Sequence, residues 1–240
     1  MNYINRPIII EGVNHSGTRL LVEILSVFGS DGGDYKNPWA ENKVYLDLHK
    51  QLINKISDKG WTKTILDNNF IKNYNDNFEF ESFITKYLDI NIPNNFPDYK
   101  SKPWHWKCPT SALFEKTWTK IYPEGWYIIN TCEPEKVAKS FVRRNASLSF
   151  KEGLRFYSIM NEKIFSVKKN NQLIIDFGNI TNEINKIAEF VPFDVSEKKI
   201  NIAKSLVKDT SKIWSKNRSI YMNLKNIYAT ILYKKYKRIK

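Results

Sequence analysis

A glycine-bounded turn between an apolar segment and an amphipathic segment is the part of this chain best suited to chemistry. Residues 8–25 read IIIEGVNHSGTRLLVEIL, with Gly12 and Gly17 in the turn and hydroxyl side chains at Ser16 and Thr18. Glycine permits a tight backbone, so peptide N–H groups and the N-terminus of the following helix converge on one point. Unpaired amides and the helix dipole both favour negative charge there. The pattern predicts binding of a phosphate or phosphosulfate.

The turn differs from a Walker A loop. That motif is GxxxxGK(S/T), in which the lysine reaches the outer phosphates of a nucleotide, whereas Thr18 and Arg19 follow Gly17 here. The HSGTR segment instead resembles the phosphosulfate loop of the sulfotransferase family, a strand followed by a (K/R)SGT-type turn and a helix. His15 stands where that family usually has lysine or arginine. The resemblance implies 3′-phosphoadenosine 5′-phosphosulfate as sulfuryl donor, held by His15, Ser16, Gly17, Thr18 and Arg19.

A second stretch, residues 132–144, extends the resemblance. It reads CEPEKVAKSFVRR and follows an apolar segment. The corresponding strand in sulfotransferases ends in arginine, then an acidic residue and proline, with a serine eight positions after the arginine. The acid-proline pair and Ser140 match, but Cys132 replaces the arginine, and a thiol cannot replace a bidentate, permanently charged phosphate ligand. The resemblance implies that Ser140 binds the donor's 3′-phosphate. Arg143 and Arg144, one helical turn further on, are placed to supply the missing charge; the alternatives are a 3′-phosphate held differently, another donor, or a degenerate, inactive member of the family.

Sulfuryl transfer also needs a general base that takes the acceptor's proton. Residues 37–41, NPWAE, resemble the NPxGxxE-type segment of many bacterial sulfotransferases and make Glu41 the preferred base. His105 and His49 are the reserve candidates. Glu41 equally fits a solvated acid at a helix N-terminus, where the dipole favours negative charge. His105 stands between two tryptophans, which is typical of a packed histidine.

Cations must stabilise the oxygen that leaves the sulfur. Residues 106–109, WKCP, resemble the KxP element that often supplies a lysine near the transferring group, so Lys107 is one candidate and His15 is another. The chain has no HExxH or CxxC pattern and its three histidines are far apart in sequence, so no metal site is expected.

Composition limits the class of protein. The chain has 240 residues, of which 42% are hydrophobic, and a formal net charge of +13. A chain of this length and content can bury a substantial core in one domain. The charge favours anionic partners such as nucleotides, acidic or sulfated glycans, nucleic acid or anionic membranes. Two cysteines imply no disulfide framework, and the N-terminal apolar run is too short for a signal-peptide core, so we expect a cytoplasmic protein.

Helical and strand patterns alternate along the chain, which is typical of an α/β fold with a mainly parallel sheet. The resemblance implies a three-layer, P-loop-like arrangement with helices on both faces of that sheet. We expect one domain over residues 1–240, with a loop-rich insertion or lid at about 68–106 around a helix near 80–88. The expected strands are the apolar run from Ile8 up to the turn that begins at Gly12, residues 126–131 and residues 172–177, with a short strand or extended segment at 63–66. The expected helices are residues 18–28, 40–57, 153–168, 180–190, 198–213 and 221–236, and one that begins at Pro134.

Two other functions fit parts of the sequence. A P-loop kinase or other nucleotide-binding phosphotransferase would explain residues 173–176, LIID, as a Walker B strand, and residues 65–67, ILD, as a weaker version, but the Walker lysine is missing. A non-enzymatic polyanion-binding module would explain the tail at 233–240, YKKYKRIK. The expected partner is a glycan or small-molecule acceptor rather than nucleic acid, with peripheral membrane contact through the basic C-terminus as a further option.

Overall fold

A four-stranded parallel sheet is the centre of the fold. The computed structural model describes residues 6–34, 40–67, 79–144 and 148–207. In this part of the chain the strand order is β2-β1-β3-β4, and every pairing is parallel. The carboxyl ends of the strands therefore lie along one edge of the sheet, where the loops that follow them can form a common site. The strands are β1 (Ile8–Gly12), β2 (His105–Lys107), β3 (Trp126–Thr131) and β4 (Asn171–Asp176).

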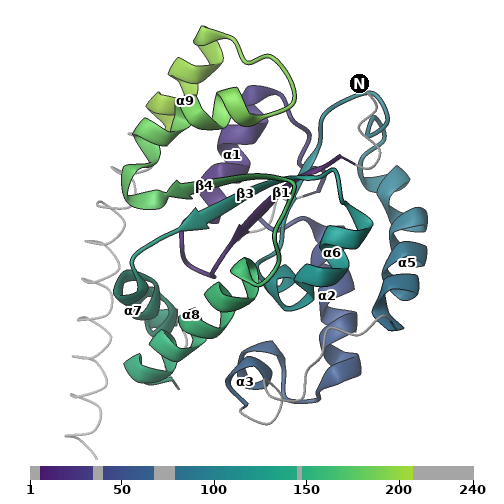
Figure 1. The fold of residues 1–240 in the computed structure, drawn as a ribbon, viewed down its shortest axis with the longest axis vertical. Helices are drawn as coiled ribbons and strands as arrows, with labels where there is room; N and C mark the ends of the chain where they lie inside the picture. The colour runs from purple at the N-terminus through teal and green to yellow at the C-terminus, as the bar shows by residue number, and fades with distance from the viewer. Residues whose placement is uncertain (1–5, 35–39, 68–78, 145–147, 208–240) are drawn as a thin grey trace, which may run out of the picture.

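Helices cover both faces of the sheet (Figure 1). Alternate side chains of β1 divide between the two faces, as the period of a strand requires. Ile8 and Ile10 pack with helices α1 and α9 in one core, whereas Ile9 packs with α2, α6 and α8 in the other. Because both faces are buried, β1 is a continuous apolar run up to Glu11 rather than an alternating one. This confirms the predicted α/β architecture with a parallel sheet.

Local sequence signals account for most helix positions. Asn42 caps the N-terminus of α2 by accepting a hydrogen bond from the Val44 amide, and Ser149 and Glu152 form a capping box on α8. The helices are α1 (Thr18–Phe28), α2 (Lys43–Ile56), α3 (Trp61–Leu66), α5 (Glu79–Asn95), α6 (Glu115–Ile121), α7 (Pro134–Arg144), α8 (Phe150–Phe165) and α9 (Ile180–Phe190). Two 3₁₀ helices, η1 (Pro109–Phe114) and η2 (Phe177–Asn179), link elements at the sheet, and residues 197–207 are helical.

Two local predictions were wrong or incomplete. The segment at 63–66 lies within helix α3 rather than in an extended segment, and the helix is followed by the capping residue Asp67. Strand β2 was not predicted, because it has only three residues, His105–Lys107, and two of them are polar. Of the basic helices predicted at 198–213 and 221–236, the first is helical to residue 207, and the rest lies outside the described residues.

The segment from 79 to 104 packs closely against the rest of the protein. Helix α5 contacts α2 and α6 and lies on the side of the molecule opposite α7 (Figure 1). Phe96 and Trp104 are fully buried, and Phe80 meets the ring of Phe114 edge-on. The aromatic residues described in this segment therefore contribute to the core. No helix among the described residues is long and apolar enough to cross a membrane.

Candidate functional site

The loop between β1 and α1 is a tight turn with left-handed backbone positions. His15 has φ 70° and Gly17 has φ 98°, and Gly17 is the N-cap of α1. The Ser16 amide donates to the Val13 carbonyl over 3.0 Å, which closes the turn. Ser16 and Thr18 are both buried in the loop, while Arg19 on the first turn of α1 is exposed. The predicted anion-binding residues thus surround the N-terminus of an eleven-residue helix.

Close contacts explain both glycines of the loop. A Cβ atom on Gly12 would lie 2.8 Å from Ser16 Oγ and 2.8 Å from Thr18 Cγ2. A Cβ atom on Gly17 would lie 2.1 Å from the ring of Phe177, which follows β4. Any other residue at either position would push the loop away from the sheet, so the glycines are required by packing as well as by backbone conformation.

Asn130 near the end of β3 forms hydrogen bonds with the loop from the sheet side. Its Nδ2 donates to the Ser16 carbonyl over 2.7 Å, and Ser16 Oγ lies 3.3 Å from the same nitrogen. Asn130 pairs with Gly12 in the sheet register, which places its side chain under the turn. This residue was not predicted from the sequence. The available signal was a polar residue at 130 in an apolar strand of the sequence WYIINT.

Lys107 and Glu41 form an ion pair beside this loop. Lys107 Nζ lies 3.4 Å from Glu41 Oε1, and the two side chains are only 4% and 13% exposed. The Asn42 amide donates to the Lys107 carbonyl over 3.3 Å, which joins the segment that carries Glu41 to the end of β2. Ala40 has φ 49°, an unusual conformation for a residue with a side chain, directly before Glu41. The structure therefore brings together the predicted base and the predicted lysine.

Electrostatics connect this ion pair to the loop. Burial lowers the pKa of Lys107, the Glu41 carboxylate opposes that change, and the positive charge of Arg19 adds to it. Arg19 is therefore close enough to Lys107 to influence its protonation. Two cations and one carboxylate thus lie next to the turn, and this edge can stabilise an anion while keeping a proton acceptor within reach.

Helix α7 carries the other predicted ligands. His15 meets the ring of Phe141 edge-on, with 5.6 Å between ring centroids, so the loop contacts the helix next to Ser140. Arg143 donates through Nη2 to Ser140 Oγ over 3.4 Å. Arg144 ends the helix, and its side chain lies outside the described residues.

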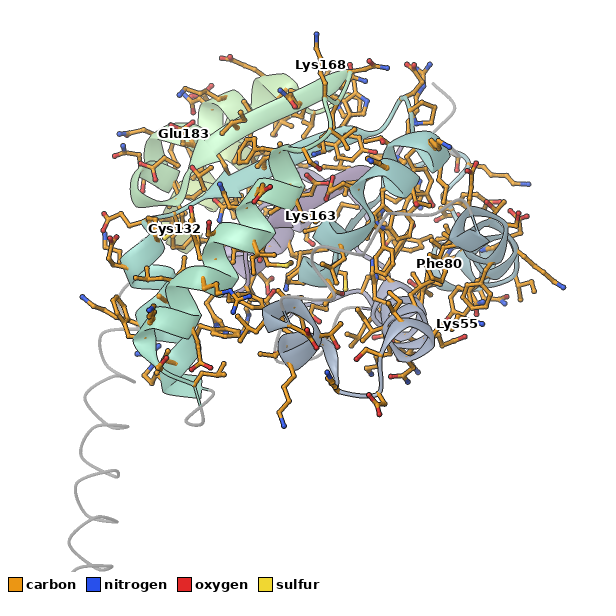
Figure 2. The ribbon with its side chains drawn as sticks, turned by 60° about the horizontal axis from the view of Figure 1, so that its bottom comes forward. Lys55, Phe80, Cys132, Lys163, Lys168 and Glu183 are labelled. Atoms are coloured by element: carbon orange, nitrogen blue, oxygen red, sulfur yellow. The ribbon has the colours of Figure 1, made fainter. Side chains whose placement is uncertain are left out.

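Cys132 lies at the start of this region, far from Lys55 and Phe80 on the opposite side of the molecule (Figure 2). Burial raises the pKa of its half-buried thiol. The thiol is therefore uncharged at neutral pH and supplies no charge for a phosphate. Positive charge at this end of the site comes from other side chains, among them Lys136 and Arg143 of α7.

The reserve bases lie away from the exposed part of the site. His49 donates through Nδ1 to the Tyr45 carbonyl over 2.6 Å, and His105 Nδ1 is hydrogen-bonded to Ser30 Oγ at 3.0 Å. Both rings are buried, and burial lowers the pKa of His49 to about 4 and that of His105 to about 3. They are packed, neutral core histidines in this structure, which leaves Glu41 as the accessible candidate.

The two Walker B candidates are placed differently in the structure. Asp67 caps helix α3 and pairs with Lys59 over 2.6 Å, so residues 65–67 form no strand. Asp176 ends β4, which is separated from β1 by β3, and its carboxylate accepts a hydrogen bond from the Gly178 amide. Among the residues that the structure describes, no three His, Cys, Asp or Glu side chains are grouped as metal ligands.

Two solved structures share this architecture. The sulfotransferase domain from the curacin biosynthetic pathway matches with a TM-score of 0.52 and 17% sequence identity, over 79% of this chain and 75% of that one. The sulfotransferase domain from the Synechococcus PCC 7002 olefin synthase matches with a TM-score of 0.54 and 16% identity, over 84% of this chain and 78% of that one. No family model and no curated protein matches the chain.

These matches define the class of fold. The protein has the fold of sulfotransferase domains, a parallel sheet with helices on both faces and a P-loop-like turn after the first strand. The resemblance seen in the sequence is confirmed at the level of the fold. Identities of 16–17% say nothing about the reaction, which has to be argued from the residues of the site.

Proposed function

We propose that the protein is a sulfotransferase that transfers a sulfuryl group from 3′-phosphoadenosine 5′-phosphosulfate to a hydroxyl or amine of a glycan or small-molecule acceptor. The observation that carries the proposal is the Lys107–Glu41 ion pair next to the glycine-bounded turn. A site for sulfuryl transfer needs an anion cradle, a cation near the leaving oxygen and a base near the acceptor. All three kinds of group lie at the carboxyl edge of the sheet.

The donor would be held mainly by the turn. Backbone amides of the loop, the N-terminus of α1 and the Ser16 and Thr18 hydroxyls fit the phosphosulfate end, because each is a hydrogen-bond donor directed by the turn. Arg19 and His15 add positive or polar contacts on either side. Ser140, with Arg143 and Arg144, would bind the 3′-phosphate from α7. The donor supplies the sulfuryl group, and no metal is required.

Glu41 and Lys107 supply the general base and the cation that sulfuryl transfer also needs. Glu41 accepts the proton of the attacking hydroxyl or amine, and its partly exposed carboxylate lets an acceptor approach. Lys107 is buried and keeps its ammonium beside the loop, where it offsets charge on the leaving oxygen. The ion pair also orients the Glu41 carboxylate before an acceptor binds, so its position depends less on side-chain motion.

The acceptor pocket and cellular setting are proposed at a coarser level. We propose a cytoplasmic enzyme of one domain, with the segment at about 68–106 contributing to acceptor binding. Residues 233–240, which lie outside the described residues, would attract acidic acceptors or an anionic membrane surface. A P-loop kinase remains the alternative, and it would require magnesium and ATP, which a sulfotransferase would not.

The first test is nucleotide binding by titration calorimetry. We expect 3′-phosphoadenosine 5′-phosphate, the product form of the donor, to bind without metal, and ATP with magnesium to bind at least tenfold more weakly. Binding of ATP that disappears in excess chelator, with no binding of the bisphosphate nucleotide, would replace the proposal by the kinase alternative.

The second test is a carboxylate substitution at the proposed base. Glu41→Gln removes the base but keeps the side-chain shape, so we expect transfer to an acceptor panel to fall by roughly 10²–10⁴-fold with nucleotide affinity nearly unchanged. Asp47→Asn is the matched control, because Asp47 also pairs with a lysine at 3.4 Å but on the surface of α2. Equal activity of the wild type and Glu41→Gln would remove Glu41 from the mechanism.

A further inference from the structure

Among the described residues, Asn130 is the one buried side chain of the neighbouring strand β3 that forms hydrogen bonds with the turn. Asn130 is 3% exposed and Ser16 is 1% exposed. The Asn130 side-chain amide donates to both the backbone carbonyl and the hydroxyl of Ser16. Its own Oδ1 is buried and makes no hydrogen bond to the described residues. The only hydrogen bonds that the structure gives this amide therefore go to Ser16.

An asparagine is an unfavourable choice for this position on stability grounds alone. Its neighbours Ile128 and Ile129 are fully buried apolar residues of the same strand. A buried amide oxygen without a partner destabilises the folded state, and an apolar β-branched residue would avoid that cost. Local departures of this kind are typical of functional sites, where stability is given up for geometry. Here the hydrogen bonds of Asn130 fix the backbone conformation of the turn at Ser16.

The hydrogen bond to Ser16 sets the direction of the next amide. A peptide unit is planar and trans, so its carbonyl and its N–H point in opposite directions. Because the Ser16 carbonyl points inward to Asn130, the Gly17 N–H points away from the sheet, into the turn at the N-terminus of α1. The second contact acts on the side chain. When Ser16 Oγ accepts from Asn130, its own hydrogen is directed elsewhere and can be donated to an anion.

We propose that Asn130 is a positioning residue that orients the Gly17 amide and the Ser16 hydroxyl toward the phosphosulfate group of the donor. The inference rests on the proposed function for the identity of the anion, but not for the geometry of the turn. Asn130 does not touch the donor. It acts through Ser16, and its amide makes the turn an anion site before any ligand arrives, which lowers the reorganisation needed on binding.

The test compares two valine variants of adjacent residues on β3. Asn130→Val removes the donor that holds Ser16 and fills the space with an apolar residue. Thr131→Val removes another side-chain donor, whose Oγ1 bonds the Ile175 carbonyl over 2.8 Å, and leaves the turn untouched. Both variants therefore lose one hydrogen bond to a backbone carbonyl. Affinity for 3′-phosphoadenosine 5′-phosphate is measured by calorimetry, and the melting temperature is measured without ligand.

We expect Asn130→Val to bind the nucleotide at least tenfold more weakly than the wild type, while its melting temperature falls no further than that of Thr131→Val. Thr131→Val should bind within about twofold of the wild type and melt at a lower temperature. A merely structural role would move affinity and melting temperature together. Unchanged affinity in Asn130→Val would overturn the proposal, and Asn130→Ala serves the same comparison if the valine variant does not fold.

A crystal structure of ligand-free Asn130→Val separates this inference from the proposed function. We expect the Ser16–Gly17 peptide to rotate once the amide donor is gone. If that peptide keeps its orientation, Asn130 does not position it and the inference is wrong. If the wild type fails to bind the nucleotide while the peptide rotates in the variant, the sulfotransferase proposal fails and the positioning role stands.

Discussion

Gly17 shows how one residue connects the anion-binding turn to the far strand of the sheet. Its backbone has φ 98°, and the ring of Phe177, which follows β4, fills the space where a Cβ would lie. The turn is thereby fixed from two sides, by Asn130 on β3 and by Phe177 after β4. A loop held in this way keeps its amides aligned without a ligand, which is the condition for electrostatic stabilisation at low reorganisation cost.

Replacement of Gly17 by alanine should therefore cost more than backbone strain alone. An L-residue in the left-handed region costs roughly 1–2 kcal/mol, and the clash with the Phe177 ring adds to that at position 17. Gly29→Ala is the matched control, because Gly29 has φ 109° and ψ 13°, close to the values at Gly17, and its Cβ would meet only the flexible end of Lys199. Urea unfolding should show a clearly larger loss for Gly17→Ala. Equal losses would mean that Phe177 moves aside freely.

Three elements meet at a buried charged cluster under the turn. Lys169, which precedes β4, lies 3.1 Å from Glu11 on β1 and 3.0 Å from Glu115 on α6. Its Nζ also donates to the Ile164 carbonyl at the end of α8. Burial raises the pKa of both glutamates, and the charge of Glu11 raises that of Glu115 further. Two carboxyl groups beside one ammonium retain one proton between them, so the cluster is close to neutral.

Removal of Lys169 should therefore lower the free energy of unfolding far more than neutralisation of Glu115 does. Lys169→Met leaves two buried carboxyl groups without a cation, and breaking a buried pair in this way costs about 3–5 kcal/mol of unfolding free energy. Glu115→Gln keeps the shape and hydrogen-bonding capacity of a protonated carboxyl group, so we expect a loss below about 1 kcal/mol. Chemical denaturation at pH 7 measures both. Similar losses would contradict a shared proton.

At the scale of the whole molecule, two histidines are fully buried: His49 lies on α2 among aromatic rings, and His105 on β2 bonds Ser30, which follows α1. Tyr45 stacks on Trp106 with ring centroids 3.9 Å apart, and His49 lies against Trp118. A protonated imidazole has little compensation in such surroundings, which is why burial lowers the pKa of His49 to about 4 and of His105 to about 3.

Acid should consequently destabilise the whole fold below the ordinary histidine pKa. The unfolded chain takes up a proton near pH 6.5, whereas the folded chain does so only near pH 4 or 3. The stability from each neutral histidine is complete above pH 6.5 and is lost as the pH falls, at about 1.4 kcal/mol per pH unit.

The buried glutamates also have raised pKa values, so the histidine contribution is measured as a difference. Urea unfolding of the wild type and of His49→Gln at pH 7.5, 6.5, 5.5 and 4.5 should give a shallower decline in the variant. Identical slopes would show that His49 does not titrate on unfolding. The comparison isolates one histidine because Glu11, Glu115 and His105 are common to both proteins.

Local sequence was sufficient for the parallel sheet, the turn and most helices. The apolar run before Gly12, the proline at the start of α7 and the helical spacing after Gly17 are short-range signals, and each depends only on backbone preference or on burial of one face. Glu41 and Lys107 were each singled out through family resemblance, and the structure brings the two side chains together in an ion pair that the sequence did not predict.

Only the tertiary structure decided which residues support the site from a distance. Asn130 on β3 and Phe177 directly after β4 are remote from the turn in sequence, and their contacts with it exist because parallel strands place their carboxyl ends on one edge. The three-residue strand β2 forms by pairing with β1, and its own sequence has no strand period long enough to detect. Pairing, burial and the sharing of a proton depend on neighbours in space, and no window of the sequence contains those neighbours.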